Sequence, residues 1–385
     1  MDPISNNINL NKTLIFSANT SWYLFNFRRN TIKSFLNEGY KVYCLSPYDE
    51  YALRLQDIGC IYLPLKINNE GFNPFSDIKL FIDILTIFIK VKPIAVFQFT
   101  IKNNIYGTYA AYILRIPSIN NISGFGTAFI HNGLKYKIAR ILYKFSLRLS
   151  TRVFCQNKDD YSFILKNKLI NQERLDLLPG SGVDLERFKR RNAYIQNLND
   201  SFVFIYAGRF LYDKGLEELV NSFEKIDQKI HKAKLWLIGF QDSKNISSIQ
   251  KSVIDEWASK PNISILEPTN EMHKVLDKAD CFVLPSYREG MPRSILEACS
   301  MELPIICTNV HGCKEIVTDK LNGLLCKPKD PDSLLQAMNS MLRMTQSSRM
   351  EMGIEGRKRV EKNYSEDIVI KKAQEALKKV LDKSR

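Results

Sequence analysis

Short apolar runs alternate with segments of helical spacing along the whole chain. This alternation is typical of parallel sheets whose strands are joined by crossover helices. A first series of runs predicts strands at 13–17, 41–46, 61–65, 94–98, 118–122, 152–155 and 175–178. A second series predicts strands at 202–207, 234–238, 263–266, 281–285, 304–308 and 323–326. The chain is therefore expected to be an α/β protein with two sheets.

The gap between the two series predicts a domain boundary. Residues 188–201 are polar, with three consecutive basic residues and several Asn, which is typical of an interdomain linker. A chain of 385 residues also exceeds what one hydrophobic core usually organises. We therefore expect Rossmann-like domains at residues 1–190 and 200–364. After residue 330 the pattern becomes helical, and a last helix is predicted at about residues 365–385.

The composition excludes several classes of protein. The eight cysteines form no C-x-x-C pair and have no His at metal-ligand spacing, so reduced buried thiols are expected instead of a zinc site or disulfides. The most apolar stretch, 80–89, contains Asp83 and is too short to cross a bilayer. No signal-peptide pattern is found at the start, so a cytoplasmic protein is expected.

The net charge of +14 is unevenly distributed. Residues 1–199 contain 26 Lys and Arg against 14 Asp and Glu, whereas the remainder contains 29 against 27. The excess indicates that the first half meets an anionic surface or ligand. On charge alone, a solvated surface tuned for solubility is an equally good interpretation.

The first candidate ligand site follows the strand at 202–207. This strand runs into Gly208-Arg209-Phe210, and Lys214-Gly215 then opens an amphipathic helix. Arg209 and Lys214 thus lie between a strand end and a helix start, where parallel sheets bind ligands and free N–H groups carry partial positive charge. A guanidinium fork and an ammonium at this place suit a diphosphate. By position alone, two surface cations in a loop are an equally good interpretation.

The second candidate site lies at 287–298, which reads Tyr-Arg-Glu-Gly-Met-Pro-Arg-Ser-Ile-Leu-Glu-Ala. Gly290 permits a tight turn and Pro292 suits the first turn of a helix. Glu289 then precedes that helix, and Glu297 lies on it about two turns further on. Two carboxylates so placed can bind hydroxyl groups at opposite ends of a sugar nucleotide, while the amides between them meet phosphate. Taken alone, Glu297 reads as an ordinary exposed helical glutamate.

These motifs resemble those of the retaining glycosyltransferases of family 4. Besides 287–298, the resemblance rests on Ala-Gly-Arg-Phe-Leu-Tyr-Asp-Lys-Gly from Ala207 and on 304–306, 312–315 and 322–324. It covers the whole second half of the chain. It implies the GT-B fold, in which two Rossmann-like domains face each other across a cleft and the last helix crosses back onto the first domain.

The resemblance also implies roles for the matching residues. The donor-binding residues that it implies are Arg209, Lys214, Glu289, Gly290, Met291, Pro292 and Glu297. The two cations hold the diphosphate of a UDP-sugar, Glu297 binds ribose hydroxyls, and Glu289 with the loop after it contacts the sugar. The front-face mechanism proposed for this family retains the α-configuration and lets the departing phosphate oxygen take the acceptor proton. Arg209, Lys214 and Glu289 are then the expected catalytic residues, and no metal or other cofactor is expected.

The first half is similar to a narrower branch that assembles bacterial O-antigen, capsule and lipid-linked glycans, including transfer of N-acetylgalactosamine to undecaprenyl-diphosphate-linked bacillosamine. The matching stretches are 22–28, 102–107 and 119–126. They imply a polyprenyl-diphosphate-linked acceptor bound by Trp22, Arg28, Lys102, Asn104, Ser123 and Gly124. Many relatives place a histidine after the strand at 118–122, where this chain has Asn121 and Ser123. A catalytic histidine is therefore not assumed. His131 is nearby in the sequence, but a lone histidine in a loop is more often structural than catalytic.

A basic amphipathic stretch lies between residues 135 and 152, where six cations alternate with apolar residues. At about 1 kcal/mol for each cation near an anionic leaflet, it favours reversible docking on the cytoplasmic face of the inner membrane. A helix that packs its apolar face on the sheet and keeps its cations in water is a compatible alternative. Asp330-Pro331-Asp332 has a D-x-D pattern, but we expect it to cap the following helix.

Two other functions remain open. A UDP-N-acetylhexosamine 2-epimerase would use the same scaffold to convert a UDP-sugar without an acceptor. A non-catalytic nucleotide-binding or nucleic-acid-binding protein would use the basic half, although no nucleic-acid-binding motif accompanies the charge. We expect a monomer that binds no nucleic acid and transfers an N-acetylhexosamine.

Overall fold

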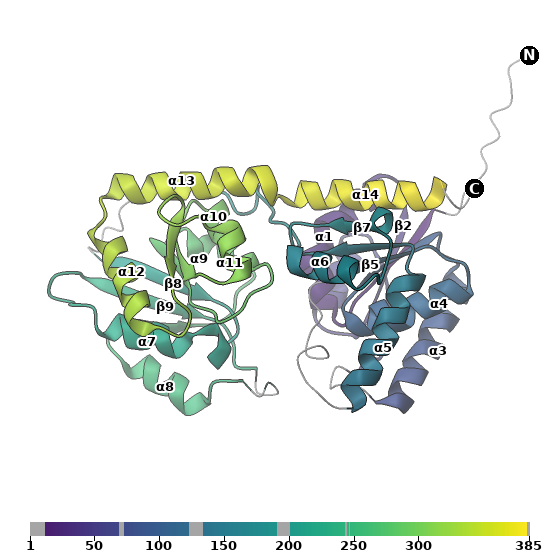
Figure 1. The fold of residues 1–385 in the computed structure, drawn as a ribbon, viewed down its shortest axis with the longest axis horizontal. Coiled ribbons are helices and arrows are strands. Elements are labelled where there is room, and N and C mark those ends of the chain that lie inside the picture. The colour runs from purple at the N-terminus through teal and green to yellow at the C-terminus, as the bar shows by residue number, and fades with distance from the viewer. Residues whose placement is uncertain are drawn as a thin grey trace, which may run out of the picture. The chain divides into compact units, whose positions relative to one another are not determined.

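The structure is a computed structural model that describes residues 12–68, 73–122, 134–190, 201–242, 245 and 247–382, with residues 134–136 described by their backbone alone. The chain divides into two compact units. Unit 1 comprises Met1–Ser181 and Asp367–Arg385, and unit 2 comprises Gly182–Glu366. Each unit is built on one parallel sheet (Figure 1).

Unit 1 has a seven-stranded sheet in the order β3-β2-β1-β4-β5-β6-β7, all parallel. Helices α1, α2 and α14 contribute to the apolar core on one face of this sheet, and α3, α4 and α5 to the core on the other. In chain order its elements are β1 (Thr13–Ser17), α1 (Ser21–Asn37), β2 (Lys41–Ser46), α2 (Tyr51–Asp57), β3 (Ile61–Pro64), α3 (Pro74–Val91), β4 (Ala95–Phe99), the π-helix η1 (Asn103–Gly107), α4 (Thr108–Ile113), β5 (Ser118–Ile122), α5 (Leu134–Leu149), β6 (Arg152–Cys155), α6 (Lys158–Lys166), the 3₁₀ helix η3 (Gln172–Arg174), β7 (Leu175–Leu177) and α14 (Glu366–Asp382).

Unit 2 has a six-stranded parallel sheet in the order β10-β9-β8-β11-β12-β13. One continuous core holds this sheet and its helices together. Its elements are β8 (Phe202–Ala207), the 3₁₀ helix η4 (Tyr212–Lys214), α7 (Leu216–Glu224), β9 (Ala233–Ile238), α8 (Lys251–Ser259), β10 (Ile263–Leu266), α9 (Met272–Leu276), β11 (Cys281–Leu284), α10 (Arg293–Ser300), β12 (Ile305–Thr308), α11 (His311–Ile316), β13 (Gly323–Cys326), α12 (Pro331–Arg343) and α13 (Gln346–Asn363).

Local signals explain where the main helices start. The Asn73 side chain accepts hydrogen bonds from two amides at the start of α3, and Pro74 occupies the first turn. The Asp330 side chain accepts from the Ser333 amide at 2.9 Å and is followed by Pro331, which confirms that this aspartate caps α12. Caps satisfy N–H groups that have no partner inside the helix, so each fixes a helix start.

The last helix belongs to unit 1, as the resemblance implied. Along α14, the side chains of Val369, Ala373, Leu377 and Val380 lie in the same apolar core as Phe16 of β1. The sequence predicted that this helix begins at Ser365 or Glu366, and it begins at Glu366. Among the described residues no helix is long and apolar enough to span a membrane.

The boundary between the units lies earlier than the predicted linker. It falls after Ser181, whereas residues 185–188 already belong to unit 2. Leu185 and Phe188 pack into the core of that unit, so the start of the predicted linker is folded structure. Residues 191–200 of the predicted linker lie outside the described residues.

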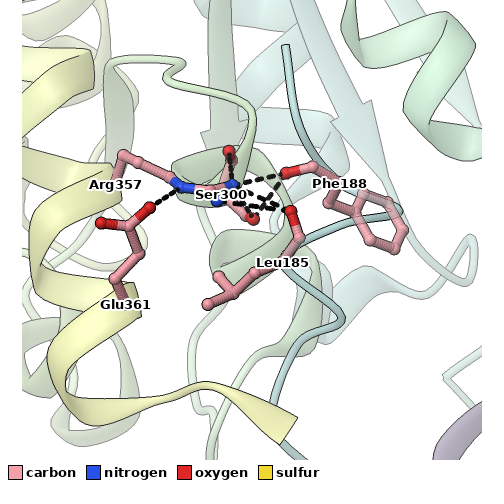
Figure 2. A network of polar contacts seen from close by, with 5 residues as sticks. All are labelled: Leu185, Phe188, Ser300, Arg357 and Glu361. Carbon is pink, nitrogen blue, oxygen red and sulfur yellow. Dashed lines mark hydrogen bonds and ion pairs between the residues drawn. The ribbon is translucent and has the colours of Figure 1, made fainter. Parts of the chain in front are cut away.

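A buried guanidinium holds this early segment of unit 2 in place (Figure 2). Arg357 of α13 donates hydrogen bonds to the carbonyl oxygens of Leu185, Phe188 and Ser300 at 3.3, 2.8 and 2.7 Å. Its Nε also pairs with Glu361 one turn further along the helix. A single side chain thus satisfies carbonyls from the segment before β8 and from the end of α10.

Candidate active site

The candidate site lies where the strand order of unit 2 reverses. From β8, the strands β9 and β10 follow to one side of the sheet, while β11, β12 and β13 follow to the other. In open parallel sheets, the loops that leave the carboxyl ends of strands at such a reversal form the ligand-binding crevice. Arg209 and Lys214 lie on the connection after β8, and Glu289, Gly290 and Glu297 on the connection after β11.

An ion pair joins these two connections. The Nζ atom of Lys214 lies 2.6 Å from Oε1 of Glu289, and the two side chains are only 19% and 12% exposed. Lys214 ends the short helix η4, and Glu289 lies in the loop before α10. An ammonium has three donors, so a pair with one carboxylate oxygen leaves donors for an anionic ligand. The structure therefore brings together one cation and one acid of the predicted site.

Gly215 allows the connections after β8 and β11 to lie close together. Gly215 has φ of +72°, and a Cβ atom placed there would lie 2.2 Å from the carbonyl oxygen of Pro285. The Tyr287 amide donates to the Asp213 carbonyl at 2.9 Å in the same region. Both the left-handed backbone and the lack of space require glycine at position 215.

Arg209 has the most exposed side chain of the four charged residues in the predicted donor set. Its side chain is 48% exposed, and its Nη1 lies 3.1 Å from Oδ2 of Asp242, a residue that follows β9. The Tyr206 hydroxyl donates to the Arg209 carbonyl at 2.9 Å and fixes the backbone where β8 ends. Burial raises the pKa of Tyr206 well above its usual value, so the hydroxyl remains a donor. The guanidinium thus lies at the carboxyl edge of the sheet, paired with Asp242 on a side chain that is about half exposed.

Glu297 is held by a residue that was not predicted as part of the site. Arg293 opens α10, directly after Pro292, and its Nε lies 2.8 Å from Oε1 of Glu297 one turn later. A second nitrogen of Arg293 lies 3.8 Å from Glu366. The i,i+4 spacing of arginine and glutamate in the sequence is the signal that could have identified this pair. Because the pair is mostly buried, the carboxylate of Glu297 has a fixed position.

The loop before α10 is also tightly packed. A Cβ atom at Gly312 would lie 2.3 Å from the carbonyl oxygen of Gly290, so the start of α11 rests on this loop. Helices α7 and α10 both begin at this edge of the sheet, and their first N–H groups have no partner within the helix. Of the predicted charged residues, the structure thus joins Lys214 to Glu289, whereas Arg209 pairs with Asp242 and Glu297 with Arg293. In the described part of the chain, no group of three His, Cys, Asp or Glu side chains is placed to hold a metal ion.

In unit 1, the residues predicted to bind the acceptor have different surroundings. Trp22 is the second residue of α1, is 43% exposed and contacts Phe27 edge-on at 5.2 Å between ring centroids. Arg28 is buried, with its guanidinium carbon 4.6 Å from the centroid of the Phe99 ring. Such stacking stabilises a desolvated guanidinium. Arg28 thus lies in the interior, below the surface on which Trp22 is exposed.

Lys102 and Asn104, two further predicted acceptor residues, lie at the start of the π-helix η1. Lys102 pairs with Asp77 at 2.7 Å, and Asn104 donates to the Asn121 carbonyl at 2.9 Å from a buried position. Thr100, just before η1, has φ of +70°, which is rare for a β-branched residue. Strained backbone and π-helices are both frequent at functional sites, and neither was predicted from the sequence. Ser123 and Gly124 lie outside the described residues.

Two family models match this chain. Residues 189–359 match the model described as "Glycosyl transferases group 1", and residues 12–157 match "Glycosyl transferase 4-like". The chain is a family 4 glycosyltransferase. The two matches confirm the family that the sequence motifs predicted. The main motifs lie on the connections that carry the Lys214–Glu289 pair.

Curated relatives share much of the length of this glycosyltransferase. It is 29% identical over 304 residues to the capsular polysaccharide biosynthesis glycosyltransferase CapM of Staphylococcus aureus, which is 77% of this chain and 79% of CapM. It is 25% identical over 341 residues to the N,N'-diacetylbacillosaminyl-diphospho-undecaprenol alpha-1,3-N-acetylgalactosaminyltransferase of Campylobacter jejuni, which is 85% of this chain and 88% of that enzyme.

Solved structures share the fold of this glycosyltransferase. The crystal structure of Anabaena HepE in complex with UDP-glucose matches with a TM-score of 0.77 and 14% identity, over 95% of this chain and 99% of HepE. A glycosyltransferase from Rickettsia africae matches with a TM-score of 0.77 and 17% identity, over 96% of this chain and 98% of that chain. These likenesses confirm the predicted GT-B fold.

Proposed function

We propose that this glycosyltransferase moves a sugar, with an N-acetylhexosamine favoured, from a UDP-sugar to a polyprenyl-diphosphate-linked saccharide in the assembly of a bacterial surface glycan. The observation that carries the proposal is the Lys214–Glu289 pair, which places a cation and an acid together where the strand order reverses. The name of the Campylobacter jejuni relative supports the acceptor class, because it specifies a diphospho-undecaprenol substrate.

In the proposed donor site, the cations and the carboxylates bind different parts of the UDP-sugar. Arg209 and Lys214 hold the diphosphate, since both lie at the carboxyl edge of β8 next to the start of α7. Glu297, fixed by Arg293, accepts hydrogen bonds from ribose hydroxyls. Glu289 and the loop of Gly290, Met291 and Pro292 contact the sugar.

The proposed reaction retains the α-configuration. The bond between the anomeric carbon and the diphosphate oxygen breaks, and the acceptor hydroxyl forms the new bond on the same face of the sugar. The acceptor proton passes to the departing phosphate oxygen, so no side chain has to act as the base. The chain's own contribution is to orient the reactants and to stabilise negative charge on the leaving group, through Arg209 and Lys214 and without a metal ion.

The proposed acceptor site lies in unit 1. Trp22 offers an exposed ring on which a sugar can stack, whereas Arg28 and Asn104 are buried, with Asn104 bound to the Asn121 carbonyl. Lys102 is anchored by Asp77 beside η1. Ser123 and Gly124 complete the predicted set. A lipid-linked acceptor requires the enzyme to work at the cytoplasmic face of the membrane as a peripheral protein.

The proposal is tested with a panel of UDP-sugars, each incubated with and without a polyprenyl-diphosphate-linked saccharide. Release of UDP that depends on the acceptor supports the transferase, and NMR of the product reports the anomeric configuration. Isomerisation of a UDP-sugar without acceptor would identify a 2-epimerase instead. Binding of UDP with no turnover of any donor would identify a non-catalytic protein. Full activity in EDTA is expected for metal-independent transfer.

A further inference from the structure

Three adjacent helices of unit 1 present an unusual number of apolar side chains to solvent. Helix α4 packs between α3 and α5, and the three lie next to one another (Figure 1). Of the nineteen large apolar side chains that are exposed in the described residues, nine lie on these helices: Phe75, Ile78, Ile82, Ile89, Tyr112, Ile113, Ile138, Ile141 and Phe145. We refer to these nine as the apolar face. Soluble proteins rarely gather exposed apolar groups in this way without a binding partner.

The apolar face is distinct from the core that the same helices build. Leu80 and Ile84 of α3, Ala111 of α4 and Leu147 of α5 all point into one core cluster against the sheet. The exposed residues of α3 recur at intervals of three, four and seven, and those of α5 at three and four, so each helix has a second stripe away from the sheet. Helices that share one core face of a sheet turn their outer stripes in a common direction.

The charge around the apolar face is mainly positive, with the half-buried Asp83 of α3 as an exception. Residues 84–158 contain eleven Lys and Arg and no Asp or Glu. Lys102 and Arg152 form ion pairs within the unit. The cations exposed on or next to the three helices are Lys79, Lys90, Lys92, Arg115, Lys137 and Arg148. The guanidinium carbon of Arg148 lies 5.8 Å from the centroid of the Phe145 ring, so a cation directly borders the apolar face.

We propose that the apolar face is a membrane-docking surface that inserts its side chains into an anionic lipid bilayer. In such a bilayer, the cations would contact the anionic headgroups, and the apolar side chains beside them would enter the acyl boundary. The inference extends the proposed function, because it gives the surface through which the enzyme reaches a lipid-linked acceptor. It also changes the expected binding mode, since attraction by the 135–152 stretch alone would be purely electrostatic. Binding therefore has a component that salt does not remove.

Flotation with lipid vesicles tests this surface on the full chain. Wild-type protein should float with phosphatidylcholine vesicles that contain about 30% phosphatidylglycerol, and far less with phosphatidylcholine alone. Part of this binding should persist in about 1 M NaCl, where the screening length is about 3 Å. The triple variant Ile78→Gln, Ile82→Gln, Ile141→Gln should bind about tenfold more weakly and lose the salt-resistant part.

The matched control changes three apolar residues of unit 2 with similar exposure, as Ile230→Gln, Leu321→Gln, Ile354→Gln, and should float like wild type. Equal flotation of both triple variants would overturn the inference, as would a wild type that ignores anionic vesicles. A wild-type dimer that becomes a monomer in the first triple variant, seen by sedimentation, would also overturn it, because a second copy would then cover the face. Vesicle binding requires no sugar donor, so a wild type that floats but transfers no sugar would refute the proposed function alone.

Discussion

The ammonium of Lys214 lies 2.6 Å from Oε1 of Glu289, and this contact joins the connection after β8 to the connection after β11. The two residues are 75 positions apart in the sequence, and neither could be paired with the other from local patterns. Of the two acids predicted for the donor site, Glu289 is thus the one that contacts Lys214, whereas Glu297 contacts Arg293. It determines how substitutions at this site should behave.

Replacing Lys214 should remove most of the turnover. Lys214→Ala takes one cation from the leaving group, and the loss of a comparable charge-stabilising donor lowers kcat by about 10²- to 10³-fold. Arg209→Ala should also reduce turnover strongly. Initial rates of UDP release at saturating donor measure both effects.

The control for Lys214 is Lys225, which pairs with Asp332 at 3.1 Å on an exposed surface of unit 2. Lys225→Ala should leave the rate within about twofold of wild type, because exposed pairs contribute little. Near-normal turnover of both Lys214→Ala and Arg209→Ala would refute their assignment to the diphosphate.

Glu297→Gln should weaken the binding of UDP. The substitution keeps the shape of the side chain but removes the charge that accepts hydrogen bonds from ribose, at a cost of about 1.5 to 3 kcal/mol, or about 10- to 150-fold in Kd. Calorimetric titration with UDP measures this change. Glu355→Gln, in the Lys358–Glu355 pair of α13, is the matched control and should bind UDP like wild type. Unchanged affinity in Glu297→Gln would place the ribose elsewhere.

Arg357→Ala should destabilise unit 2 without affecting the donor site directly. It leaves the carbonyls of Leu185, Phe188 and Ser300 without this donor (Figure 2), so the free energy of unfolding should fall by about 2 to 4 kcal/mol. Urea titration measures the loss, with exposed Lys358→Ala as the control. Equal stability of the two variants would mean that water replaces the guanidinium at no cost.

Buried thiols should make the protein less stable at alkaline pH. Burial raises the pKa of Cys299 and of Cys326 from about 9 to about 12. As the pH rises above about 9, ionisation of these thiols lowers the free energy of the unfolded chain but not of the folded chain, so stability falls by about 1.4 kcal/mol per thiol for each pH unit. Urea titrations at about pH 8 and pH 10 measure this fall. The double variant Cys299→Ala, Cys326→Ala should show a shallower fall, and an identical one would contradict the assignment.

The sequence predicted the sheets closely because buried parallel strands are nearly continuous apolar runs. The predicted strands 13–17, 202–207 and 323–326 have the observed bounds, and β3 and β11 each end one residue before the prediction. The unit boundary was less predictable. Phe188 is a single apolar residue in a polar segment, and only the packing of unit 2 shows that it belongs to a core.

The candidate site was predictable as a set of motifs but not as a set of contacts. Lys214 and Glu289 stood out because each follows an apolar strand, where ligands bind. Their partners are set by the order of the strands, which no local pattern specifies, so Asp242 was missed as the partner of Arg209. The exposed stripes of α3 were missed for a related reason, since an apolar helix in a sequence looks the same whether its second face is buried or open to solvent.

The two units are completed at different times during synthesis, because α14 belongs to unit 1 but follows unit 2 in the sequence. All of unit 2 is synthesised before residues 367–382, so its core does not depend on α14. Synthesis of unit 1 begins first, yet the core residues that α14 contributes, from Val369 to Val380, are added after all of unit 2. Until then the apolar side chains that meet α14 remain uncovered and open to misassociation, so nascent chains that stall before this helix should depend on chaperones.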